Sequence, residues 1–218
     1  QNLPVIFAID RGGIVGEDGA THQGVFDISF LSPIPNLTIL APKNYAELKY
    51  MFEFAVHHQG PIAIRYPRGT EGKQVALMNT QAIEYGKSEV LEEGEKIAII
   101  GIGKMVELAV ATASLLKKKG IKPYVINARF AKPIDVETLE DIAPKITHII
   151  TLEDNMIAGG FGENLSALLQ KNKSFNHINI CNMGFPDEFI EHGSANEIYI
   201  NYGLDKKSVA QRIENLLK

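Results

Sequence analysis

The sequence predicts an α/β protein in which an incomplete parallel sheet is followed by a second, self-sufficient α/β unit. Apolar runs of strand length alternate with amphipathic helical stretches, and a polar segment separates the two sets. With 218 residues, 45% hydrophobic and 22% charged, the chain has the composition of a globular protein. Its net charge of −4 and the lack of a long basic run argue against nucleic-acid binding.

The first unit, residues 1–72, is expected to contain three strands and one helix. Its strands are predicted at 4–9, 37–40 and 62–66. Pro4–Ile9 is apolar at every position, which favours a strand buried on both faces. Asn44 followed three residues later by Glu47 is a capping-box pattern, so a helix is expected to begin there.

Residues 73–94 are polar and poor in periodic signal, and we interpret them as a linker, with a short hairpin near Tyr85–Gly86. The second unit then spans 95–218. Strands are expected at 97–101, 124–126, 148–152 and 178–181, and helices at 106–119, 135–142, 162–170 and 205–217. Asp135 and Asp205 are the predicted N-caps of two of these helices.

The most informative segment is Asp10–Asp27, which reads DRGGIVGEDGATHQGVFD. A long, polar, glycine-rich loop after an apolar strand is poor packing material, and ligands bind beyond the carboxyl ends of parallel strands. His22 lies among small and polar residues, so its ring is expected to be accessible for proton transfer near neutral pH. The alternative is a loop histidine that merely caps a turn.

Two arginines follow strands of the predicted first sheet, Arg11 after the first and Arg68 after the third. Guanidinium groups at the same edge of a sheet can converge on a phosphate or a carboxylate. The alternative is that each pairs with a nearby acid, Asp10 or Glu71. Arg65, inside the third strand, is expected to form a structural ion pair.

Three further patterns suggest sites, each with a structural alternative that we favour. Ile100–Gly103 follows a strand and precedes a helix, as a dinucleotide-binding loop does, but it lacks the third glycine of that motif. Gly159–Gly162 opens a helix and could hold an anion, but we favour a tight strand-to-helix turn or a close subunit contact. Glu153–Asp154 follows a strand, and we interpret it as a solvated loop or an interface pair. Acids surround Asp18, but no metal-ligand spacing is present, so no metal site is expected.

Composition also bears on the setting of the chain. The lone cysteine, Cys181, permits no internal disulfide and suits a reducing, cytoplasmic compartment. No apolar run is long enough to span a bilayer. The chain begins with Gln1 and leads directly into a strand, from which we expect it to be part of a longer polypeptide.

A family resemblance connects these segments. DRGGIVGEDGATHQGVFD, PNLTILAPKNYAEL and GPIAIRYPRG resemble the pyrimidine-binding domain of the 1-deoxy-D-xylulose-5-phosphate synthases, thiamine-diphosphate enzymes related to transketolase. EKIAIIGIGKMVELA, THIITLEDNMIAGGFGENL and GFPDEFIEHGSANEIYINYGLD resemble the transketolase-like C-terminal domain of the same family. The resemblance covers nearly the whole chain in order.

The resemblance implies decarboxylation of pyruvate and transfer of the two-carbon unit to glyceraldehyde 3-phosphate, which feeds isoprenoid, thiamine and pyridoxal synthesis. It implies that His22 transfers a proton or donates a hydrogen bond at the reacting centre. Asp18 would contact or orient the substrate, and Arg11 and Arg68 would bind its phosphate. It also implies a homodimer.

This chain departs from the family pattern in lacking the upstream segments that bind the cofactor. The diphosphate and Mg²⁺ site, the activating glutamate and the aromatic residues on the aminopyrimidine are all absent. We therefore expect the 218-residue chain to bind neither group alone and to be inactive without the missing N-terminal domain. The alternatives are the β subunit of a 2-oxo-acid dehydrogenase E1 component and a non-catalytic dimerisation module.

Overall fold

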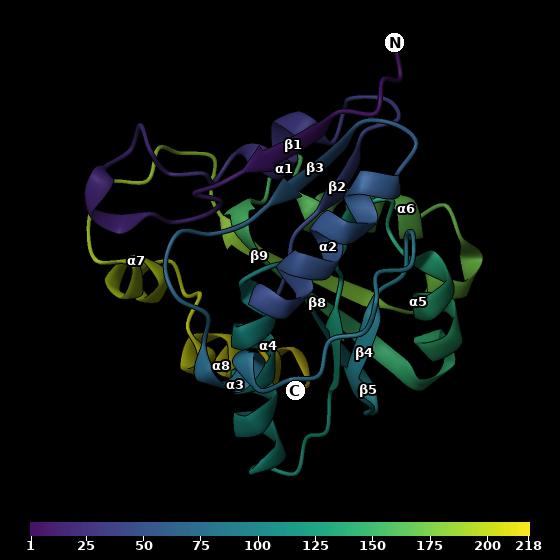
Figure 1. Cartoon of the computed structure of the whole chain (residues 1–218). Helices are drawn as coiled ribbons and strands as arrows, with labels where there is room; N and C mark the ends of the chain where they lie inside the picture. Colours follow the sequence, from purple (N-terminus) through teal and green to yellow (C-terminus); the bar gives the residue numbers. More distant parts are fainter.

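The computed structural model describes all residues, 1–218. The fold consists of two β-sheets with helices packed on them (Figure 1). The strand orders are β1-β3-β2-β7 and β4-β6-β5-β8-β9. The strands are β1 (Ile6–Ile9), β2 (Thr38–Leu40), β3 (Ile62–Arg65), β4 (Glu89–Glu92), β5 (Lys96–Gly101), β6 (Tyr124–Asn127), β7 (Phe130–Lys132), β8 (Ile146–Met156) and β9 (Asn179–Phe185). The helices are α1 (Asp27–Leu31), α2 (Tyr45–His57), α3 (Lys73–Ala76), α4 (Met105–Lys117), α5 (Val136–Ile142), α6 (Phe161–Leu169), α7 (Ala195–Asn201) and α8 (Lys206–Leu216), with 3₁₀ turns η1 (Gly16–Asp18), η2 (Ala143–Lys145) and η3 (Lys173–Phe175).

The first sheet contains the three strands predicted for the first unit, and they run parallel. Helix α2 packs over one face through Met51, against Leu40 and Ile64 of the sheet. The side chain of Asn44 accepts the N–H of Glu47 at 2.8 Å, which confirms the predicted cap. The Glu47 carboxylate, however, accepts the N–H of Lys43 at 2.7 Å, so the pattern is completed one residue earlier than in a capping box.

The prediction that the first strand is buried on both faces is wrong. β1 is the outermost strand of its sheet, with β3 as its only neighbour. Ile6 is 38% exposed and Phe7 is 48% exposed, because no element of this chain covers β1 on its outer side. An exposed apolar strand at a sheet edge is a surface suited to pairing with further polypeptide.

The segment 73–94 is not a simple linker, and the hairpin near Tyr85–Gly86 is absent. The segment contains α3, a turn at 84–87, and strand β4, which pairs antiparallel with β6. Its polar residues are used in tertiary contacts: Glu89 lies 2.7 Å from the buried ammonium of Lys43 and 3.3 Å from the Arg129 guanidinium. Because those partners lie far away in sequence, local composition alone suggested a solvated connection.

The two units are joined more closely than the sequence indicated. Strand β7 follows β6 in the second unit but pairs antiparallel with β2 of the first, with Phe130 opposite Leu40. One apolar core includes Ile39 and Ala63 from the first sheet together with Ala98 and residues of α6. The space between the sheets is therefore shared core.

The second sheet has the expected parallel arrangement of β5, β6, β8 and β9. The predicted N-caps are confirmed, since Asp135 accepts the N–H of Thr138 at 3.2 Å and Asp205 accepts that of Lys207 at 2.9 Å. Helix α4 packs with α8 on one side of this sheet, and α5 and α6 lie toward the other (Figure 1). None of the helices has the length and apolar character needed to cross a membrane.

Candidate functional site

The loop after β1 closes on itself at a narrow neck. Gly13 and Gly24 exchange two backbone hydrogen bonds, of 2.9 and 2.8 Å, and the N–H of Gly12 donates to the carbonyl of Tyr66 at 2.9 Å. Gly13 has a φ of +78°, and a Cβ there would lie 1.9 Å from Oδ2 of Asp154. The neck therefore requires glycine at this position, both for its backbone conformation and for the close approach of Asp154.

Arg65 lies beneath this neck and forms the structural ion pair expected from the sequence. Its Nη1 donates to Asp154 Oδ1 at 2.8 Å and its Nε to Asp27 Oδ2 at 3.0 Å. Its Nη2 also donates to the backbone carbonyl of Gly24 at 2.9 Å. The two carboxylates raise the pKa of Arg65 against the opposing effect of burial, while burial raises the pKa of Asp27. The pairing with Asp154 agrees with the interface-pair interpretation, whereas the solvated-loop interpretation is wrong, because Glu153 and Asp154 are buried within β8.

Arg11, Asp18 and Arg68 meet at the tip of the loop. Oδ2 of Asp18 lies 2.6 Å from Arg68 Nη1 and 3.3 Å from Arg11 Nη1. All three side chains are at least a third exposed, so these ion pairs add little to stability and leave the guanidinium groups open to solvent. The 3₁₀ turn η1 carries Asp18 to this position. The guanidinium groups of Arg11 and Arg68, which come from the ends of two different strands, therefore both contact the same carboxylate oxygen of Asp18.

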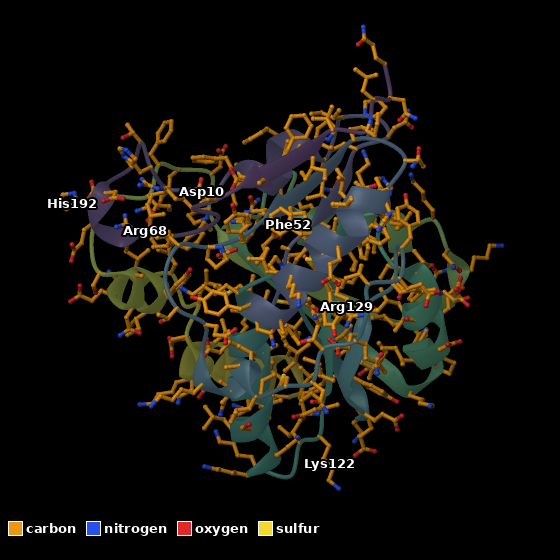
Figure 2. All side chains as sticks on the ribbon, in the orientation of Figure 1. Asp10, Phe52, Arg68, Lys122, Arg129 and His192 are labelled. Atoms are coloured by element: carbon orange, nitrogen blue, oxygen red, sulfur yellow. The ribbon has the colours of Figure 1, made fainter.

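The acids considered as partners for these arginines are not the ones used. Glu71 accepts the N–H of Tyr45 at 2.7 Å, at the first turn of α2, and no ion pair joins Arg11 to Asp10. Figure 2 shows Arg68 and Asp10 at the same end of the molecule, with His192 nearby. The shared partner Asp18 could not be inferred from chain proximity because it is 50 residues from Arg68.

His22 lies in the same loop, four positions after Asp18, and its ring is exposed. Its Nδ1 lies 3.1 Å from Thr21 Oγ1, and its backbone N–H donates to the Gly19 carbonyl at 3.0 Å. The ring makes no hydrogen bond to Arg11, Asp18 or Arg68. A hollow beside Arg68, lined also by Tyr45, Tyr66 and Lys104, does not include the His22 ring.

The turn at 159–162 is occupied by carboxylates of the chain itself. Glu153 accepts the N–H groups of Phe161 and Gly162 at 2.7 and 2.9 Å, and Glu163 accepts that of Gly159 at 2.8 Å. This is the tight-turn alternative, in which the helix N-terminus is satisfied internally. Burial raises the pKa of Glu153 to about 8, against the opposing effect of the two N–H donors.

Ligands for a metal ion do not gather within the chain. No group of three or more His, Cys, Asp or Glu side chains has a suitable arrangement. The carboxylate nearest the candidate site, Asp18, is engaged by two arginines. The residues present therefore do not fit a diphosphate-bound Mg²⁺.

Comparison with known proteins identifies both units. The profile of the transketolase pyrimidine-binding domain matches residues 1–72, and that of the transketolase C-terminal domain matches residues 86–209. The chain belongs to the transketolase family. The resemblance found in the sequence motifs is thus confirmed, and the mixed α/β architecture is the one that this family has.

Among individual transketolase relatives, 1-deoxy-D-xylulose-5-phosphate synthase of Desulforudis audaxviator is 49% identical over 216 residues, 99% of this chain. The enzyme of the same name from Caldanaerobacter subterraneus subsp. tengcongensis is 48% identical over 213 residues, 98% of this chain. The chain spans 34% of the length of each.

A solved structure described as a split-gene transketolase, an inactive β4 tetramer, superposes with a TM-score of 0.85 at 25% identity, over 98% of this chain and 66% of that one. A Pichia stipitis transketolase variant, 20% identical, superposes with a TM-score of 0.75 over 97% of this chain and 30% of its own. The second comparison concerns the fold alone.

Proposed function

We propose that this chain is the acceptor-binding part of a 1-deoxy-D-xylulose-5-phosphate synthase. The complete enzyme decarboxylates pyruvate and transfers the two-carbon unit to glyceraldehyde 3-phosphate. Relatives of that name are 48–49% identical over almost the whole chain. The observation that carries the proposal is the convergence of Arg11 and Arg68 on one anionic oxygen at the carboxyl ends of β1 and β3.

In this proposal Arg11 and Arg68 bind the phosphate of the acceptor. Two exposed guanidinium groups that already share a carboxylate oxygen have the geometry for a phosphate oxygen, with charge-assisted bonds as the source of affinity. Asp18 contacts or orients the substrate from between them. His22, exposed on the same loop, transfers a proton or donates a hydrogen bond at the reacting centre.

Thiamine diphosphate and Mg²⁺ would bind through the part of the polypeptide upstream of this chain. Support comes from the 34% share of the relatives' length that the chain spans. The 218-residue chain alone is therefore proposed to be inactive. The description of the split-gene transketolase β4 tetramer as inactive is in keeping with this proposal.

The proposal divides the chain into the end of a pyrimidine-binding domain (1–72), a connecting segment (73–94) whose strand β4 adds to the second sheet, and a C-terminal domain (95–218). The exposed apolar residues of β1 suit contact with the missing N-terminal part and with a second subunit of a homodimer. A cytoplasmic location and a role in isoprenoid, thiamine and pyridoxal precursor synthesis belong to the same proposal.

The test is turnover by the complete enzyme with pyruvate and thiamine diphosphate, with and without glyceraldehyde 3-phosphate. Formation of 1-deoxy-D-xylulose 5-phosphate only when both substrates are present is the expected result. Steady release of carbon dioxide without the phosphorylated acceptor, with transfer to a lipoyl group instead, would identify the E1 alternative. Steady carbon dioxide release by the 218-residue chain alone would contradict the proposed inactivity.

A further inference from the structure

The loop after β1, residues 10–26, carries Asp18 and His22, and we call it the candidate active-site loop. A segment of the C-terminal domain, residues 186–194, lies against it. Figure 1 shows the loop after β1 and the connection into α7 side by side at one end of the molecule. The N–H of Gly193 approaches the carbonyl of Gly16 at 3.4 Å. A Cβ on Gly16, where φ is +77°, would lie 3.0 Å from the carbonyl oxygen of Gly193. A side chain at position 16 would therefore be crowded by the backbone of this segment, and glycine lets the two backbones approach.

The side chain of Gln23 links this segment to the loop. Gln23 is 6% exposed, although both its neighbours in sequence are more accessible. Its Oε1 accepts the N–H of Val15 at 2.8 Å, and its Nε2 donates to the backbone carbonyl of Glu191 at 3.4 Å. One buried amide thus ties both ends of the 15–23 turn together and joins them to the C-terminal domain.

Apolar contacts fix the stem of the loop while its tip stays accessible. Ile14 and Val25 are buried in the core of the C-terminal domain, in one cluster with Ile190. The Phe26 and Phe189 rings meet edge to face with centroids 5.8 Å apart. Between the two stem positions, the side chains at the tip are exposed, among them Glu17, Asp18, Thr21 and His22.

We propose that Gln23 is a positioning residue for the acceptor-phosphate site, and that residues 186–194 form the support to which it holds the loop; this inference rests on the proposed function. Gln23 touches no substrate. Its amide sets the shape of the turn from which Asp18 and His22 project, and thus the place of Asp18 between Arg11 and Arg68. Pyruvate has no phosphate, so its binding depends less on this geometry.

The test compares Gln23→Met with Glu191→Ala in the complete enzyme. Methionine preserves the length of the side chain but removes both hydrogen bonds. Alanine at 191 leaves the backbone carbonyl that Gln23 uses. For Gln23→Met we expect KM for glyceraldehyde 3-phosphate to rise about 5- to 10-fold, the loss expected from one or two net hydrogen bonds. KM for pyruvate should stay within about two-fold of wild type. Glu191→Ala should change neither KM.

Equal changes of the two KM values in Gln23→Met, or no change in either, would overturn the inference. If that variant does not fold, Phe189→Ala decides by the same criteria, because it removes the contact of residues 186–194 with Phe26 at the stem of the loop, at a side chain that is 77% exposed. Failure of the proposed function is a separate result. In that case the wild-type enzyme itself forms no 1-deoxy-D-xylulose 5-phosphate from the two substrates.

Discussion

Arg65 of β3 and Asp154 of β8 form an ion pair that joins the two units of the chain: Arg65 Nη1 lies 2.8 Å from Asp154 Oδ1, and the side chains are 3% and 1% exposed. The same guanidinium donates to Asp27 and to the carbonyl of Gly24 at the neck of the candidate active-site loop. One side chain therefore contributes both to the interface between the units and to the closure of the loop. Disturbing Arg65 should affect both.

Arg65→Met should lower the free energy of unfolding by about 3–5 kcal/mol, because it leaves the buried carboxylate of Asp154 without its partner. Urea unfolding followed by circular dichroism measures this loss. Arg212→Met, at an exposed position of α8, is the matched control and should stay within about 0.5 kcal/mol of wild type. A loss below about 1 kcal/mol for Arg65→Met would show that the pair contributes little.

Gly13→Ala and Gly19→Ala form a pair that separates steric clash from backbone strain. Both glycines have left-handed φ angles, +78° and +84°. An added Cβ at Gly13 would lie 1.9 Å from Asp154 Oδ2, whereas at Gly19 it would meet no atom within 4 Å. Gly19→Ala should therefore cost about 1–3 kcal/mol for the conformation alone, because its φ of 84° and ψ of 177° lie in a region that glycine alone normally occupies, and Gly13→Ala clearly more. Thermal unfolding of the two variants side by side tests this, and equal losses would contradict the predicted clash.

Much of the fold could be predicted from local patterns, but the contacts between distant segments could not. Alternating apolar runs and capping residues such as Asn44, Asp135 and Asp205 predicted the longer helices and most of the strands, but not the short elements α1, α3, β7 and α7. Strand β4 was missed because Lys43 and Arg129, the partners of its Glu89, lie far away in sequence. The prediction that β1 is buried was wrong because burial depends on the neighbours that a strand has in the fold. An apolar sequence does not show that β1 is an outermost strand, paired only with β3.

For the candidate site, the sequence indicated which residues to examine but not how they combine. The convergence of Arg11 and Arg68 followed from the ends of parallel strands. Their shared partner Asp18 depends on a 3₁₀ turn that no propensity signalled. The role proposed for Gln23 depends on a hydrogen bond from its side-chain amide to the backbone carbonyl of Glu191. That residue is 168 positions away, so nothing in the sequence signalled the contact. An arginine at the end of an apolar strand was the one available signal for the Arg65 pair.

Arg68→Ala in the complete enzyme should raise KM for glyceraldehyde 3-phosphate about 10- to 100-fold, as expected for loss of one charge-assisted contact. KM for pyruvate should change by less than about two-fold, because Arg68 is assigned to the phosphate. Steady-state kinetics with each substrate varied in turn measures both values. Arg212→Ala serves as the charge-matched control at an exposed site. Similar increases in the two KM values would remove Arg68 from phosphate binding.

His22→Ala should lower kcat about 10²- to 10⁴-fold, the range for loss of a proton-transferring group. The protein should keep its stability, since the ring is exposed and its only side-chain partner is Thr21. His57→Ala, at the exposed end of α2, should leave kcat unchanged and controls for the loss of an imidazole. A fall in kcat of less than about tenfold would show that His22 has no chemical role.

Glu153 should make the stability of the protein fall as pH rises from about 4.5 to about 8. Burial raises the pKa of Glu153 from 4.5 to about 8, so in this range the folded state keeps a proton that the unfolded state has released. A state that binds more protons loses stability as pH rises, by at most about 1.4 kcal/mol per pH unit for one group. Burial also raises the pKa of Asp27, which adds to the slope.

Glu153→Gln should reduce this slope, because the neutral amide has no proton to release. Urea unfolding at pH 5, 6, 7 and 8 compares the variant with wild type. Glu163→Gln on the same turn is the control and should retain the wild-type slope, since that side chain is exposed. Parallel curves for wild type and Glu153→Gln would mean that the N–H groups of Phe161 and Gly162 stabilise the carboxylate enough to offset its burial.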